Sequence, residues 1–231
     1  MTGVDDGARS DRLTSGLEVV SVLTSVLLVT WGIVPLVPRL RWVMAIPFLL
    51  SLALMMHSHW RRGETAEEIG LTSRHLWSAG RRLILPMAIA ATILLLIGVK
   101  TGMLQGPRRI SPLLLPLILS GIAQQYLLQG FIHRRIRLTL GAGEEGGARP
   151  STTAAFLTAC CFAIVHAPNL TLTLLTFGGG LVWSRVYQKA PNIYAIGISH
   201  GLMSLLVINT LPPWILHSLS VGYKHFLYQK F

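Results

Sequence analysis

Three separate stretches of this 231-residue chain place polar side chains inside apolar sequence. Amide and hydroxyl groups can donate hydrogen bonds to a developing oxyanion, and a neutral imidazole can take up a proton near pH 7. Because buried polar groups are costly in apolar surroundings, we expect these stretches to converge on one polar pocket. The residues concerned are Gln124, Gln125 and Gln129 in the first stretch, His166 in the second, and His200 and Ser204 in the third.

The spacing within these stretches suggests how they lie on helices. Gln125, Gln129 and His133 are four residues apart and would share one helical stripe. Such side chains could also serve only as hydrogen-bonding contacts between helices. Gly197 and Gly201 form a small-xxx-small pair, which favours a close approach of their helix to a neighbour.

The composition indicates whether the segments that carry these residues lie in water or in lipid. Hydrophobic residues make up 52% of the chain and charged residues 13%, whereas a soluble domain carries roughly 25% charged residues. A soluble globular domain and a disordered chain are therefore excluded, and lipid is the expected solvent. The net charge of +11 comes from cations that lie between apolar runs. This pattern favours loops that face lipid headgroups, and no nucleic-acid partner is expected.

The predicted fold is an all-α, polytopic membrane bundle of about seven or eight transmembrane helices. Backbone groups cannot stay unpaired in lipid, so the apolar runs must be helical. Four charge-free runs approach the roughly 20 residues that a span needs, namely 19–38, 42–60, 83–99 and 110–133.

Two longer charge-free runs, 150–184 and 190–223, follow. Pro168 should break the first run, and Pro212 and Pro213 should end a helix in the second. We expect a fifth span ending near His166, a sixth from about Leu170, a seventh from about Asn192 to Asn209, and either a short eighth span or an interfacial helix over 214–231.

The predicted organisation is a solvated, cytoplasmic N-terminal tail, residues 1–16, and a single membrane domain, residues 17–231. Most Lys and Arg residues fall on the side of the N-terminus and of loop 61–82, which the positive-inside rule places in the cytoplasm. Loop 61–82 is predicted to contain an amphipathic segment on the membrane surface. Counting helical rise from that side, the first Gln and the two His lie roughly 12–20 Å deep, so a cavity in the cytoplasmic half could contain all three.

The polar stretches resemble the motifs of the CAAX protease and bacteriocin-processing family of intramembrane proteases, the CPBP or ABI family. The family motifs are Glu-Glu-x-x-x-Arg, Phe-x-x-x-His with Asn three residues later, and His-x-x-x-Asn. This chain has Gln124-Gln125-Tyr-Leu-Leu-Gln129, Phe162-Ala-Ile-Val-His166 with Asn169, and His200-Gly-Leu-Met-Ser204. The order and spacing agree, and the similar core covers about residues 110–208.

The resemblance implies an endopeptidase that acts on membrane-anchored substrates. In the family, the first Glu and one His activate water, while the other His and the Asn stabilise the oxyanion. It thus implies catalytic roles for positions 124, 166, 200 and 204. The resemblance also implies a supporting pocket made by Gln125, Gln129, Phe162 and Asn169.

The departures from the family motifs concern the catalytic base. Gln124 cannot take up a proton, although Ser204 can still donate a hydrogen bond. Gln125 and Gln129 replace a Glu and an Arg together, so neither charge is stranded, and an amide–amide hydrogen bond between them becomes feasible. These substitutions predict a retained fold and cavity without the usual base.

Other groups could replace that base. Glu144 and Glu145 lie in a Gly-rich loop and are expected to be solvated. His166 or His200 could act as the base, with Gln124 orienting water. No metal and no other cofactor is expected, since two His without a further ligand make a poor zinc site. All nine acidic residues are expected in tails or loops, with Glu18 at most touching a helix end.

Three functions remain open from the sequence. The first is a divergent intramembrane endopeptidase that cuts a membrane-anchored peptide or protein, such as a prenylated one. The second is a catalytically inactive relative that binds membrane segments or partner proteins. The third is a small transporter component, because transporters place polar residues near helix breaks. In each case the partner is the lipid bilayer, and a bacterial cytoplasmic membrane is the expected location.

Overall fold

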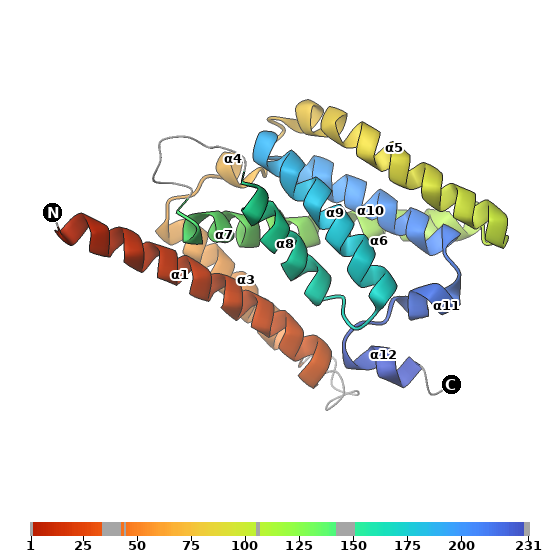
Figure 1. The fold of residues 1–231 in the computed structure, drawn as a ribbon, viewed down its shortest axis with the longest axis horizontal. Coiled ribbons are helices and arrows are strands. Elements are labelled where there is room, and N and C mark those ends of the chain that lie inside the picture. Colours follow the sequence, from red (N-terminus) through yellow and green to blue (C-terminus); the bar gives the residue numbers. More distant parts are fainter. Residues whose placement is uncertain (1, 34–42, 44, 105–106, 142–150, 229–231) are drawn as a thin grey trace.

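The computed structural model describes residues 2–33, 43, 45–104, 107–141 and 151–228, and every long element in these ranges is a helix (Figure 1). The all-α class is thereby confirmed. The predicted loop that carries Glu144 and Glu145 lies outside the described residues.

The N-terminal helices form one side of the molecule. Helix α1, Thr2–Leu27, continues into a π-helical turn η1, Leu28–Ile33, and α3, Ala45–Arg61, packs against α1 (Figure 1). The segment predicted as a tail is therefore helical from Thr2 onward. A helical candidate span, Arg9–Ile33, begins ten residues before the predicted run at residue 19.

The polar loop after α3 folds back onto the bundle. It contains a short helix α4, Ala66–Ile69, which starts with a capping box between Thr65 and Glu68. Ile69 is buried, and its carbonyl accepts a hydrogen bond of 2.8 Å from the Tyr187 hydroxyl. The segment predicted as amphipathic thus buries its apolar side chain against protein.

The long helix α10 packs against two other long helices, α5 and α6. Helix α5 runs over Leu76–Thr101 and α10 over Ile193–Thr210. Helix α6, Pro107–Gln125, continues as a π-helix η3, Tyr126–His133, and then as α7, Arg134–Thr139.

Glycines allow α10 to lie directly against α6. A Cβ atom on Gly197 would lie 2.5 Å from Ile122 Cα, and one on Gly201 would lie 2.6 Å from Ile118 Cα. No real side chain tolerates such contacts, so the two backbones meet only because both residues are Gly. The predicted close approach of this helix is confirmed.

The second half of the chain contains the predicted helix breaks. Helix α8, Thr152–Ile164, ends before Pro168, and α9, Leu170–Lys189, begins after it. The C-terminal segment holds only short elements: α11, Pro213–Leu216, a 3₁₀ turn η4, His217–Leu219, and α12, Tyr223–Tyr228. None of these is long enough to cross a membrane, so the option of an eighth span in this segment is wrong for the described residues.

Four described helices are long and apolar enough to span a membrane. They are Arg9–Ile33, Leu76–Thr101, Pro112–Thr139 and Ile193–Thr210. The apolar α8 has only 13 residues, and α3 has 17, which is short for a span of about 20. The membrane character of the fold is therefore supported, whereas a count of seven to eight spans is not confirmed.

A buried ion network ties the N-terminal helices to α7. The fully buried Arg135 guanidinium lies 2.6 Å from Glu64 Oε2 and 2.9 Å from Glu18 Oε2. Arg134 and His59 also contact the Glu64 carboxylate, each at 2.6 Å. The expectation that Glu18 at most touches a helix end was wrong, because α1 starts early and carries Glu18 in its interior, facing Arg135.

The Glu64 carboxylate is held in its charged form. Burial by itself would raise the pKa of Glu64, but hydrogen bonds from Arg135, His59 and Arg134 outweigh burial and keep this pKa well below its usual range. Glu64 lies between α3 and α4, so one carboxylate links α3, α7 and the adjoining loop.

Glu64→Gln is expected to destabilise the protein by about 3–5 kcal/mol, because it leaves Arg135 buried without half of its counter-charge. The measurement is thermal unfolding of the purified protein in detergent, followed by circular dichroism. Since the pKa of Glu64 is lowered on folding, its stabilisation is present above roughly pH 4 and is lost as the pH falls further. The difference between wild type and variant should therefore shrink toward pH 3.

Glu67→Gln is the matched control, since Glu67 pairs with Arg74 at an exposed site. An exposed pair contributes about 0–1 kcal/mol, so this variant should unfold near the wild-type temperature. Equal unfolding temperatures for Glu64→Gln and Glu67→Gln would contradict a stabilising role of the buried network.

Candidate active site

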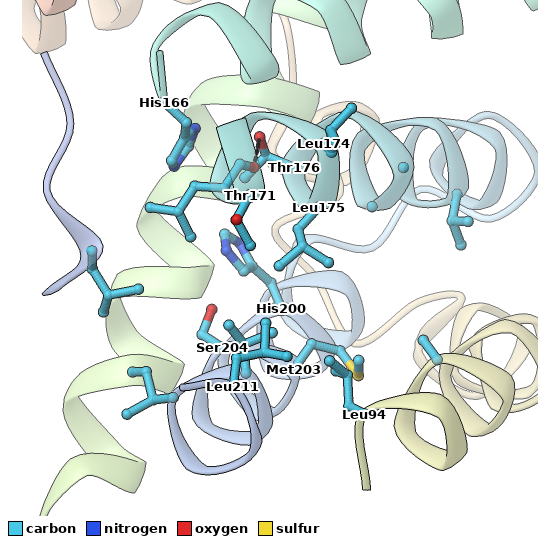
Figure 2. A pocket seen from close by; sticks show the side chains of 18 of the residues that line it. Leu94, His166, Thr171, Leu174, Leu175, Thr176, His200, Met203, Ser204 and Leu211 are labelled. Atoms are coloured by element: carbon cyan, nitrogen blue, oxygen red, sulfur yellow. Dashed lines mark hydrogen bonds between the residues drawn. The ribbon is translucent and has the colours of Figure 1, made fainter. Parts of the chain in front are cut away.

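A cavity of about 790 Å³ lies between α5, α6, α9, α10 and the C-terminal segment. Most of its lining is apolar, and its polar side chains gather around two histidines. Figure 2 shows His166, His200 and Ser204 in the wall of this cavity. All four residues predicted as catalytic contribute to the lining, with Gln124 joining these three from α6.

His166 lies in the turn between α8 and α9 with one ring nitrogen committed. Its Nδ1 lies 2.7 Å from the Phe162 carbonyl oxygen. A carbonyl only accepts hydrogen bonds, so Nδ1 must carry the proton. In the neutral ring, Nε2 is then an acceptor that could take a proton from water.

His200 is fixed by an amide and by two aromatic rings. The Gln125 amide nitrogen lies 3.2 Å from His200 Nδ1, and both residues are buried. The imidazole packs 4.6 Å from the Trp183 ring and 5.6 Å from the Phe162 ring, measured between centroids. Phe162 also lies 4.9 Å from His166, so one buried ring holds both histidines.

Gln124 and Ser204 supply hydrogen-bonding groups to the same cavity. Gln124 donates one N–H to Ser120 Oγ at 2.9 Å. The Gln124 side chain makes no other hydrogen bond with the described residues. Its amide oxygen Oε1 and its second amide N–H can therefore bind a ligand. Ser204 lies one helical turn after His200 on α10, so its hydroxyl and the imidazole share a face.

Three polar side chains at the end of α6 and along η3 contact three different helices. Gln125 contacts His200 on α10, Gln129 donates to Ser184 on α9 at 3.0 Å, and His133 contacts Thr158 on α8 at 2.8 Å. The suggested hydrogen bond between the amides of Gln125 and Gln129 is therefore not formed. The π-helix explains this result, since its i→i+5 pattern changes the angle between residues four apart.

Asn169 has a structural position outside the cavity lining. Its Oδ1 accepts a hydrogen bond from Leu172 N, which caps α9. Its Nδ2 donates to the carbonyls of Leu216 and Ser220 in the C-terminal segment. Gln125 and Phe162 likewise lie outside the lining and contact the cavity histidines, whereas Gln129 contacts Ser184, which does not line the cavity.

Sequence reasoning missed several lining residues. Trp183 and the apolar residues Leu211, Ile215, Leu219 and Val221 all contribute to the wall. An apolar side chain in a chain of this composition gives no signal of its own, so these residues could not have been identified from sequence.

The cavity extends from the middle of the bundle toward the end that lies away from loop 61–82. The helical rise counted from loop 61–82 predicts a cavity in the half of the bundle next to that loop. Buried side chains such as Tyr187 and Ile193 fill the core at that end. The cavity instead extends to Ile97 and Leu211, at the far ends of α5 and α10.

No carboxylate contributes to the lining of this cavity. Among the described residues, the carboxylates of Glu18 and Glu64 are partly buried, and both belong to the ion network with Arg135. Within the described ranges, no group of three His, Cys, Asp or Glu side chains could hold a metal ion. The titratable groups of the lining are thus His166 and His200.

Comparison of the chain with protein families adds to this geometry. Residues 106–206 match the family described as type II CAAX prenyl endopeptidase Rce1-like. This segment of the chain is thus similar to that family. It begins just before α6 and ends on α10, so it contains the three polar motifs, and the resemblance drawn from them is confirmed.

The Rce1-like segment covers somewhat less than half of the chain. Comparison with curated proteins and with solved structures gives no match. The family assignment and the four apolar helices together support an integral membrane protein.

Proposed function

We propose that this chain is a CAAX-type intramembrane endopeptidase in which histidine replaces glutamate as the general base. The observation that carries the proposal is the His166 ring, whose Nδ1–H is held by Phe162 O while its Nε2 remains an acceptor. Substrates are membrane-anchored peptides or proteins, prenylated ones included, because an apolar cavity surrounds the polar groups.

In the proposed reaction, His166 Nε2 takes a proton from water as the water oxygen attacks the scissile carbonyl carbon. Gln124 orients this water through its free amide atoms. Hydrogen bonds from Ser204 and from His200, in the tautomer that carries a proton on Nε2, stabilise the oxyanion. The protonated His166 then donates its proton to the leaving nitrogen as the C–N bond breaks.

The proposal includes a membrane arrangement. The chain forms a single membrane domain over residues 17–231, preceded by residues 1–16 on the cytoplasmic side. Seven spans cross a bacterial cytoplasmic membrane. The excess of Lys and Arg on the side of loop 61–82 supports this orientation.

A second function is favoured by one observation, the absence of Asp and Glu from the cavity lining. A relative that lost the catalytic base could keep the cavity to bind lipidated or membrane-embedded segments. Under this alternative, wild type binds such peptides without cleaving them.

His166→Ala is expected to lower kcat by about 10²–10⁴-fold with a small change in KM, since it removes the general base and leaves the apolar lining intact. The measurement is cleavage of a prenylated, membrane-anchored peptide by protein reconstituted in liposomes. The control is His57→Ala, because His57 is exposed on α3 and does not line the cavity. Equal turnover by wild type and His166→Ala would exclude His166 as the base.

Gln124→Glu is expected to raise kcat at least about tenfold, because it places a carboxylate base in the cavity at the position where the family motif has Glu. The same liposome assay measures it, with Gln124→Met as the control of similar size that lacks a base. Cleavage by Gln124→Glu together with no cleavage by wild type would contradict the proposed enzyme and favour the binding function.

A further inference from the structure

The C-terminal segment closes one side of the cavity. Residues 211–222, which we call the strap, follow α10 and run past the turn that carries His166. Four apolar strap side chains line the cavity: Leu211, Ile215, Leu219 and Val221. In Figure 1 this part of the chain lies beside the tip of the α8–α9 pair.

Two residues beside His166 hold the strap by hydrogen bonds. Asn169 Nδ2 donates to Leu216 O at 2.8 Å and to Ser220 O at 3.2 Å. The Ala167 carbonyl accepts a bond of 2.8 Å from Gly222 N. The strap is therefore attached to the same short turn that positions one of the two cavity histidines.

The strap backbone is strained between the two bonds of Asn169. His217, Ser218 and Leu219 have φ values of 45°, 51° and 57°, a left-handed conformation that residues with side chains rarely adopt. Such backbone persists only where the surrounding contacts impose it. The Asn169 bonds end on the carbonyls directly before and directly after these three residues.

We propose that Asn169 is a positioning residue that clamps the strap over the cavity. While both bonds are formed, the strap completes the apolar wall beside the histidines. When they are lost, the strained turn relaxes, the strap moves away, and an apolar ligand chain can reach the cavity from this side. This closure by the strap does not depend on peptide cleavage, because a protein that only binds its ligand in the cavity would use it as well.

The chain offers a matched control for Asn169. Asn192 is also a fully buried N-cap residue, on α10, whose Nδ2 donates to two main-chain carbonyls, those of Thr72 and Arg74. Aspartate keeps the capping oxygen at either position and removes the two donors. Asn169→Asp and Asn192→Asp therefore remove equivalent bonds, one pair at the strap and the other at the opposite end of the bundle.

The test measures thiol labelling of a cysteine placed in the cavity wall. Val207→Cys provides the thiol in a background where Cys160 and Cys161 are changed to Ala, and a water-soluble maleimide is applied to protein in liposomes. Asn169→Asp should raise the labelling rate at least about tenfold, because two buried hydrogen bonds are lost. Asn192→Asp should leave the rate within about twofold of the parent.

A second variant, Gly222→Ala, tests the attachment of the strap through Gly222 N and Ala167 O, and it does so even if Asn169→Asp does not fold. Gly222 has a φ of 58°, and an added Cβ would lie 2.5 Å from Thr30 O. Gly222→Ala should therefore displace the strap and raise labelling as well. Unchanged labelling in a folded Asn169→Asp or Gly222→Ala protein, or an equal rise in Asn192→Asp, would overturn the clamp. Neither result depends on peptide cleavage, so the proposed function is tested separately.

Discussion

The pairing of buried polar side chains where α6 continues into η3 is the interaction on which the site depends. Polar groups are costly to bury without a partner, and Gln125, Gln129 and His133 each contact a polar side chain on another helix, namely α10, α9 and α8. The Gln125 contact fixes His200, whose ring then packs on Trp183 and Phe162. The position of the histidine therefore depends on the contact with the Gln125 amide nitrogen as well as on apolar packing.

Charge is separated from the cavity in this structure. Carboxylates and guanidinium groups form a largely buried network between α1, α3 and α7, while a neutral amide, two imidazoles and three hydroxyl groups supply the polar groups of the cavity lining. The network stabilises the bundle around a site without a formal charge. In this account, proton transfer depends on the imidazoles, and on the hydrogen bonds that decide which ring nitrogen carries the proton.

The sequence predicted the features that follow from local chemistry. Motif spacing identified four of the polar lining residues, Pro168 located a helix break, and Gly197 and Gly201 indicated close helix contact. Features that depend on distant partners were missed. The π-helical geometry of η3 redirected its amides, α1 began early enough to bring Glu18 to Arg135, and the C-terminal segment packed on the cavity through apolar residues that carry no sequence signal.

Peptide cleavage in this cavity is proposed to proceed through its two histidines. The most direct measurement compares wild type with the double variant His166→Ala/His200→Ala in liposomes that contain a prenylated, membrane-anchored peptide, with products identified by mass spectrometry. We expect a single cleaved bond with wild type and no product above background with the double variant. The same product at the same rate from both proteins would contradict this proposal.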